Sequence, residues 1–85
     1  MRAYTRYAQS SGRTASGTVP TNGRTIAVDP RVIPLGTVIE IEGLGKRIAE
    51  DTGSHVKGKK LDLFLSSVQA CTQFGVRSRK VYIID

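Results

Sequence analysis

The sequence predicts a small, mainly β domain in which six short strands close into a barrel, with one short helix near the C-terminus. Apolar and polar residues alternate over short stretches, and glycine and proline separate these stretches. The chain has 85 residues, which is enough for one small core. Closure is expected because an open sheet in so short a chain would leave two unprotected edges. We therefore expect residues 1–85 to form a single domain.

The first two strands are expected on either side of a long polar loop. Residues 2–7 alternate loosely and contain strand-forming tyrosine and threonine. Residues 8–23 are rich in serine, glycine and threonine, which favours a loop. The second strand covers residues 25–28 and ends at Asp29, because Pro30 biases the residue before it towards an extended conformation and cannot donate to a ladder.

The middle of the chain predicts two further strands joined by a glycine turn. Residues 37–42 place Ile39 and Ile41 on one face and two glutamates on the other, which is typical of a half-buried strand. Residues 43–45 form the turn, and residues 46–51 form the next strand.

The last third predicts two strands and the helix. The elements expected there are an extended run at 60–64, a helix at 66–74 and a final strand at 77–84. Ser66 fits the N-cap, and Gln69 follows three residues later as in a capping box. Gly75 fits the left-handed position that ends a helix.

Composition excludes several classes of function. A net charge of +6 combined with 39% hydrophobic residues is too apolar for a disordered basic tail. No apolar run approaches the roughly 18 to 20 residues of a membrane span, so no membrane insertion is expected. Residues 1–6 are followed by no apolar stretch, so we expect no signal peptide; a protein acting outside the cytoplasm would be exported by a separate route or from a longer precursor.

The side chains available for chemistry are few. His55 is the only histidine and Cys71 the only cysteine, so neither an intramolecular disulfide nor a zinc site of the usual kind can form, and we expect no metal and no cofactor. A catalytic triad or dyad through His55 is formally open, but Cys71 lies in an apolar segment where a packing role is the default. Carboxylate chemistry must come from seven residues: Asp29, Glu40, Glu42, Glu50, Asp51, Asp62 and Asp85.

Several ordered blocks of the sequence resemble the three-aspartate (3D) domain family. The blocks are residues 14–17, 23–30, 33–37, 49–53, 56–58 and 61–64. The same blocks are similar to the catalytic domain of MltA-type lytic transglycosylases, whose barrel is of the double-psi kind. The resemblance runs from about residue 3 to residue 83 and implies a six-stranded double-psi β-barrel with one short helix.

The resemblance implies a lytic transglycosylase, which cleaves peptidoglycan glycan strands between N-acetylmuramic acid and N-acetylglucosamine and leaves a 1,6-anhydro ring on the muramic acid. By position, the catalytic aspartate falls on Asp62 and the supporting aspartate on Asp51, whereas Asp29 is expected to shape the site. The C6 hydroxyl of the sugar attacks in this reaction, so Asp62 can serve first as acid and then as base. Peptidoglycan at the bacterial cell wall is the expected partner.

The residues themselves allow this role for Asp62 without requiring it. Asp62 stands between Leu61 and Leu63, so two-residue alternation places its carboxylate opposite both leucines. If the leucines fill the core, Asp62 faces a groove, where apolar surroundings and a nearby Asp51 would raise its pKa as an acid catalyst requires. From spacing alone, an ordinary surface aspartate is the simpler interpretation. The Asp-Thr-Gly segment that begins at Asp51 also fits an Asx-type turn.

Six further residues are candidates for shaping the site or binding substrate: Asp29, Thr14, Ser16, Thr52, Gly53 and Lys57. His55 is a seventh; it stands where the family commonly has a small residue, a departure that affects substrate fit more than catalysis.

Two other functions remain open, a non-catalytic barrel that binds the cell wall and a lysozyme-like hydrolase with water as the acceptor. The positive charge suits an anionic cell wall, and three tyrosines and two phenylalanines, none in an RNA-binding signature, argue against nucleic acid. A phage-type endolysin and a domain of an exported parent fit the sequence equally well. The oligomeric state stays open.

Overall fold

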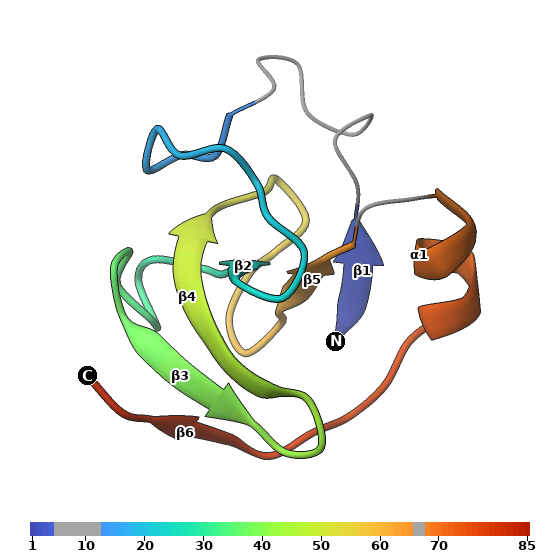
Figure 1. Cartoon of the computed structure of the whole chain (residues 1–85). Coiled ribbons are helices and arrows are strands. Elements are labelled where there is room, and N and C mark those ends of the chain that lie inside the picture. The colour runs from blue at the N-terminus through green and yellow to red at the C-terminus, as the bar shows by residue number, and fades with distance from the viewer. Residues whose placement is uncertain (5–12, 66–67) are drawn as a thin grey trace.

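The computed structural model describes residues 1–4, 13–65 and 68–85, which form six strands and one short helix (Figure 1). The elements are β1 (Arg2–Tyr4), β2 (Thr25–Ala27), β3 (Val38–Ile41), β4 (Gly45–Asp51), β5 (Asp62–Phe64), α1 (Val68–Phe74) and β6 (Val81–Ile83). The mainly β character and the six strands confirm the predicted fold class. Residues 5–7 of the predicted first strand, residues 8–12 of the predicted loop and the predicted N-cap Ser66 lie outside the described residues.

The central hairpin follows the predicted pattern. Strands β3 and β4 pair antiparallel, with Ile39 in register with Arg47 and Ile41 with Gly45. Ile39 and Ile41 are buried, whereas Glu40 between them is exposed, as alternation requires. The local sequence pattern alone therefore predicts which face of β3 is buried.

The helix ends as its sequence predicts. Gly75 has a φ of 63°, and its N–H donates to the Cys71 carbonyl oxygen at 3.2 Å, which closes the last turn. The side chain of Phe74 is buried, and the guanidinium of Arg77 lies 4.4 Å from the centre of its ring. No helix in the described residues is long and apolar enough to cross a membrane.

The strand order in the sheet is β1-β5-β2-β4-β3-β6. The periodicity of the sequence does not predict this order. Strand β2 lies at its centre, parallel to β4 and antiparallel to β5, and β1 pairs parallel with β5. Segments far apart in the sequence are thereby placed side by side. The core lies on one face of this curved sheet and consists of Ile26, Val28, Ile33, Ile39, Ile41, Ala49 and Leu61.

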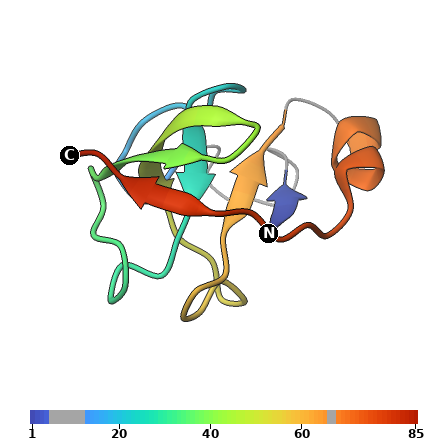
Figure 2. The same ribbon diagram turned by 90° about the horizontal axis from the view of Figure 1, so that it is seen from below.

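The prediction of a closed barrel is wrong for the part of the chain that the structure describes. Strands β1 and β6 are the two edges of the sheet. They approach each other only before β6 begins, where the Met1 amine donates to the Arg77 carbonyl oxygen at 2.7 Å and the Arg77 N–H donates to the Met1 carbonyl oxygen at 2.8 Å. Figure 2 shows the segment leading into β6 beside the N-terminus. Within the described residues β1 pairs with β5 and β6 pairs with β3, and this contact does not extend into a ladder between the two edges.

Candidate active site

Two aspartates lie in one row across the centre of the sheet. Ala27 of β2 is in register with Asp51 of β4 on one side and with Asp62 of β5 on the other. Residues in register project to the same face, and neighbouring strands lie about 4.8 Å apart, so the two aspartate Cα atoms are about 10 Å apart. Ala27, whose side chain is a methyl group, therefore stands between the two aspartates in this row. Arg2 of β1 continues the row beyond Asp62.

A groove follows this row. Its first part is a cavity of about 190 Å³ lined by Tyr4, Ala27, Asp51, Thr52, Gly53, Ser54, His55, Val56 and Asp62. Its second part is a cavity of about 570 Å³ lined by Met1, Arg2, Ala3, His55, Lys60, Leu61, Asp62 and Val76. The two cavities share His55 and Asp62, so Asp62 lies in the middle of the groove and not at its end.

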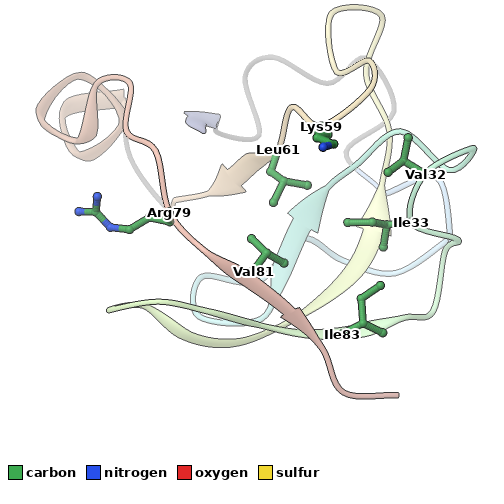
Figure 3. Close-up of a pocket in the computed structure, with 7 residues that line it drawn as sticks. All are labelled: Val32, Ile33, Lys59, Leu61, Arg79, Val81 and Ile83. Carbon is green, nitrogen blue, oxygen red and sulfur yellow. The ribbon is translucent and has the colours of Figure 1, made fainter.

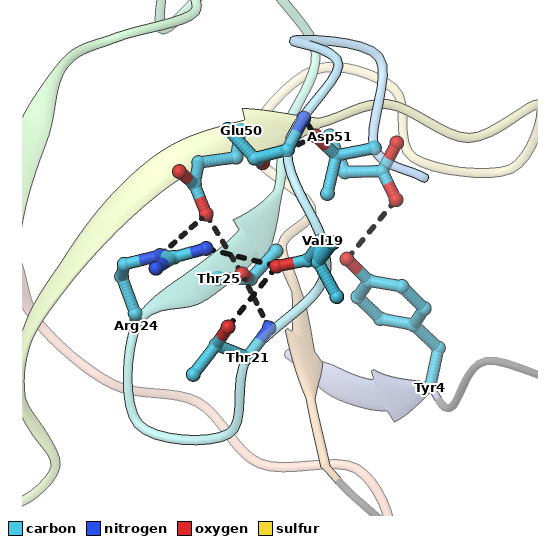
Figure 4. Close-up of polar contacts among 9 residues, drawn as sticks. Tyr4, Val19, Thr21, Arg24, Thr25, Glu50 and Asp51 are labelled. Carbon is cyan, nitrogen blue, oxygen red and sulfur yellow. Dashed lines mark hydrogen bonds and ion pairs between the residues drawn. The ribbon is translucent and has the colours of Figure 1, made fainter. Parts of the chain in front are cut away.

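The carboxylate of Asp51 is held by three described donors. The backbone N–H groups of Ala15 and Thr52 donate to Oδ1 at 3.0 and 2.9 Å, and the Tyr4 hydroxyl donates to Oδ2 at 3.1 Å (Figure 4). Asp51 is 6% exposed. Burial, with Asp51 as the next cause, raises the pKa of Tyr4 well above its ordinary value, so the phenol remains a hydrogen-bond donor. These contacts fix the orientation of the Asp51 carboxylate.

The side chain of Asp62 has different surroundings. Leu61 and Leu63 are buried, and Asp62 is half-buried and faces the groove, as alternation predicts. Burial raises the pKa of the Asp62 carboxyl, and the positive charges of Arg2 and the N-terminal amine oppose this rise. Of the two causes expected from the sequence, apolar surroundings and a nearby Asp51, burial is the leading one. A carboxyl with a raised pKa in a groove is suited to deliver a proton.

Asp29 lies behind the groove and lines neither cavity. Its Oδ1 accepts hydrogen bonds from the backbone N–H and Nε of Arg31 at 3.0 and 3.1 Å. Its Oδ2 accepts from Nη2 of Arg31 at 2.9 Å and from the Gly58 N–H at 2.8 Å. The Arg31 guanidinium holds the pKa of this carboxyl well below its usual range. Asp29 thereby ties the turn after β2 to the loop that carries His55.

A second polar cluster secures the loop that reaches Asp51. Oε1 of the buried Glu50 accepts from the Thr25 hydroxyl at 2.7 Å and from Nε of Arg24 at 3.0 Å (Figure 4). The Glu50 carbonyl oxygen accepts from the Ser16 N–H at 2.9 Å, next to the Ala15 N–H that contacts Asp51. Sequence reasoning missed the roles of Glu50 and of Tyr4, because both depend on contacts between distant strands.

The other predicted residues divide into two groups. Thr52, Gly53 and His55 line the groove, and a Cβ on Gly53 would lie 3.0 Å from Cγ2 of Val56, so this position has little room for a side chain.

Three others line neither cavity: Thr14, Ser16 and Lys57. The buried Thr14 places its hydroxyl 2.7 Å from that of Thr18, and Lys57 is exposed, so substrate contact by these three stays a prediction. Within residues 1–4, 13–65 and 68–85, no group of three His, Cys, Asp or Glu side chains is arranged to hold a metal ion.

The sequence places this chain in a known family. Residues 24–85 match the family model of the 3D domain, and the chain belongs to that family. All three aspartates of the sequence blocks lie within the matched residues.

Two proteins of Bacillus subtilis (strain 168) are similar to the chain over most of its length. YabE, to which a role in cell wall shaping is ascribed, is 42% identical over 78 residues, which cover 88% of this chain and 19% of YabE. The cell wall-binding protein YocH is 41% identical over 78 residues, which cover 88% of this chain and 27% of YocH. The chain thus spans about a fifth to a quarter of the length of these relatives.

Two solved structures share the fold. The lytic transglycosylase LtgG of Burkholderia pseudomallei is 25% identical, with a TM-score of 0.60, over 85% of this chain and 27% of LtgG. MltA from E. coli has a TM-score of 0.65 over 84% of this chain and 26% of MltA. At 19% sequence identity, the comparison with MltA shows a similar fold and nothing further.

Proposed function

We propose that this domain is a lytic transglycosylase that acts on peptidoglycan glycan strands at the bacterial cell wall. The observation that carries the proposal is the row of Asp51, Ala27 and Asp62 in the middle of a groove. Membership of the 3D domain family and the likeness to LtgG support it. On this proposal residues 1–85 form one catalytic domain of the double-psi barrel kind.

In the first step Asp62 acts as the acid. The protonated carboxyl donates its proton to the glycosidic oxygen between N-acetylmuramic acid and N-acetylglucosamine, and the bond from that oxygen to C1 of the muramic acid breaks. The N-acetylglucosamine leaves with a free hydroxyl, and positive charge develops at C1. The half-buried position of Asp62 supports this role, because burial favours the protonated form at neutral pH.

In the second step Asp62 acts as the base. Its carboxylate accepts the proton of the C6 hydroxyl of the same muramic acid, whose oxygen attacks C1 and closes the 1,6-anhydro ring. The proton returns to Asp62, so no water is consumed and no metal or cofactor takes part. Asp51, fixed by Tyr4, Ala15 and Thr52, is the supporting carboxylate on the other side of Ala27.

The groove continues on both sides of Asp62, as cleavage within a polymer requires. The larger cavity is lined by Arg2, Lys60 and His55, with Asp62 as its one acidic residue. The lactyl group and peptide stem of muramic acid carry carboxylates, which such a lining would attract. We therefore assign the muramic acid side of the substrate to this cavity.

A second candidate function is wall binding without turnover. The identity of 41% to the cell wall-binding protein YocH favours it. A binding domain needs the groove but has no need of a half-buried carboxyl with a raised pKa at its centre. The third function, hydrolysis, differs from transglycosylation only in using water in the second step.

Mass spectrometry of the soluble products from purified peptidoglycan distinguishes these functions. The proposal expects muropeptides with anhydro ends, which lack one water relative to reducing ends. Reducing ends would show a hydrolase and would contradict the anhydro mechanism. Intact peptidoglycan that still sediments with the protein would support the wall-binding function and overturn the enzyme.

A further inference from the structure

Strand β6 carries two apolar side chains on the core side of the sheet, and the described residues cover one of them, Val81, only in part and leave the other, Ile83, largely uncovered. Val81 and Ile83 are in register with Ile41 and Ile39 of β3, which are buried in the core. Residues in register project to the same face, so Val81 and Ile83 also point to the core side of the sheet. Ile83 is nevertheless 65% exposed, because the sheet stays open along β6.

A cavity of about 330 Å³ lies against this face of β6 (Figure 3). Its lining consists of Val32, Ile33, Lys59, Leu61, Arg79, Val81 and Ile83. Ile33 and Leu61 belong to the hydrophobic core, so the cavity reaches the core itself. A smaller cavity of about 160 Å³ shares Lys59, Leu61, Arg79 and Val81 with it and extends along Arg77 and Ser78. We call the two cavities together the β6 seam.

The charge of the β6 seam has one sign. Lys59, Arg77 and Arg79 line it, and neither cavity has an acidic residue in its lining. All three cations are exposed, beside an apolar floor. Such a surface attracts a partner that is both acidic and apolar.

The backbone of β6 is also able to accept another strand. The Glu42 N–H donates to the Lys80 carbonyl oxygen, and the Ile84 N–H donates to the Val38 carbonyl oxygen, both at 2.9 Å. These bonds alternate along an antiparallel strand, so the backbone groups of Val81 and Ile83 point away from β3. In the described part of the chain, β6 has a paired strand on one side only.

We propose that the β6 seam binds an extended, acidic segment of another polypeptide, which adds to the edge of β6 as a strand. The side chains on one face of this added strand would meet the seam: its apolar ones would pack on Ile83 and Val32, and carboxylates on the same face would meet the cations of the seam. The sheet would then gain the neighbour that its open edge lacks. The Asp51–Asp62 row does not line the seam, so the groove stays free for glycan.

Other occupants fit the lining less well. Sugar rings are bound by aromatic faces and many hydrogen-bonding groups. Among the described residues, the two cavities are lined by no aromatic ring and by one hydroxyl, that of Ser78. A phosphate polymer or nucleic acid would use the cations and leave the apolar floor bare. A second copy of a chain with a net charge of +6 would bring more positive charge to a cationic surface.

Fluorescence anisotropy tests the proposal with a fluorescein-labelled peptide, Glu-Thr-Glu-Thr-Val-Thr-Ile-Thr-Glu-Thr-Glu, which as a strand has its apolar and acidic side chains on one face in either direction. Binding to the full chain is expected, and Ile83→Ser and Arg79→Glu should each weaken it by at least about tenfold. Tyr82→Ser, on the same strand but the opposite face, and Lys46→Glu, a charge reversal outside the seam, should leave binding unchanged. Ile83 and Arg79 are both exposed, so the variants should fold. Circular dichroism checks this.

Three control peptides and one control measurement decide between occupants. Serine in place of valine and isoleucine, lysine in place of the acids, or one central proline should each abolish binding. Equal binding by the serine peptide would overturn the proposal, because cations alone would explain it. Unchanged binding by Ile83→Ser would do the same. Sedimentation that shows a dimer of the wild-type chain, lost in Ile83→Ser, would make a second copy the occupant and also overturn it.

Discussion

Asp29 and Asp62 are the same residue type in two opposite settings. Asp29 is 2% exposed, and two donor residues, Arg31 and Gly58, saturate its oxygens. Asp62 is half-buried in the groove, and no residue in the described part of the chain donates a hydrogen bond to its side chain. The pKa of Asp29 is lowered by its Arg31 partner, whereas burial raises the pKa of Asp62.

The different surroundings of the two aspartates suit Asp29 to a structural role and Asp62 to a chemical one. When an arginine donates hydrogen bonds to a carboxylate, the charged form of the carboxylate is stabilised, and the pair can hold two loops together. A carboxyl that is desolvated but unbonded holds its proton to a higher pH than usual, which suits it to deliver that proton to a substrate. Asp51 lies between these extremes, since it is buried and bonded like Asp29 yet lines the groove like Asp62. Substitutions at the three positions should therefore differ in kind.

Asp62→Asn should give the largest effect on activity. Asparagine preserves the shape of the side chain and removes the transferable proton, so the variant should fold while glycan cleavage falls by about 10² to 10⁴. Turnover of purified peptidoglycan, followed by release of anhydro-muropeptides, measures the loss. A folded Asp62→Asn variant with near wild-type release would exclude Asp62 as the acid.

The pH profile of the wild type sharpens the same comparison. The reaction begins from protonated Asp62, so kcat/KM should decline as pH rises through the raised pKa of this carboxyl. The midpoint should lie above the value of about 3.9 for an unperturbed aspartate. A midpoint at or below that value would place the proton on another group.

Asp51→Asn should reduce turnover less than Asp62→Asn, but by at least about tenfold. The fold should survive, because asparagine can still accept from the N–H groups of Ala15 and Thr52. Tyr4→Phe provides a graded companion, since it removes one of the described hydrogen bonds to Asp51 and leaves the carboxylate charge in place. Steady-state kinetics should show a fall in kcat with little change in KM for both. Loss of the folded state in Asp51→Asn would support the Asx-turn interpretation instead.

The local parts of this arrangement were predictable from the sequence. Alternation around Ile39 and Ile41 predicts a half-buried strand, and alternation around Leu61 and Leu63 predicts that Asp62 faces away from the core. The helix end at Gly75 follows from the conformational freedom of glycine. Each of these features depends on neighbours within a few residues.

The parts that depend on topology were not predictable in this way. Ala27 separates Asp51 from Asp62 only because β2 lies between β4 and β5, and sequence periodicity carries no information on strand order. The Tyr4 bond to Asp51 likewise joins two strands whose bonded residues are 47 positions apart in the sequence. The open edge at β6 was missed because both the argument about unprotected edges and the resemblance implied closure, and neither shows whether β1 and β6 pair.

Asp29→Asn should destabilise the fold and leave the chemistry of the folded molecules unchanged. The lowered pKa means that the stabilising contribution of Asp29 is complete above the unfolded pKa of about 3.9 and is lost as pH falls towards the lower folded value. The melting temperature should therefore drop at neutral pH, and the gap to wild type should narrow in acid. Glu42→Gln, which alters an exposed carboxylate, is the matched control and should change neither quantity. A difference in melting temperature that is the same at every pH would show that the charged form of Asp29 does not stabilise the fold.

Arg2→Gln should give the smallest effect and tests the contrast between the two arginines. Arg31 contacts Asp29 directly, whereas Arg2 shares the larger cavity with Asp62 and lowers the pKa of Asp62 through its charge alone. Its removal should move the high-pH limb of kcat/KM to higher pH, because protonated Asp62 then loses its proton less readily. It should also raise KM for peptidoglycan by a factor of about two to five, as loss of one exposed charge contact predicts. Salt should raise KM less in Arg2→Gln than in wild type, since screening acts on a contact that the variant lacks. Lys46→Gln removes the same charge outside the groove and should reproduce none of these changes; a limb that moves to lower pH in Arg2→Gln would contradict the assignment of Asp62 as the titrating acid.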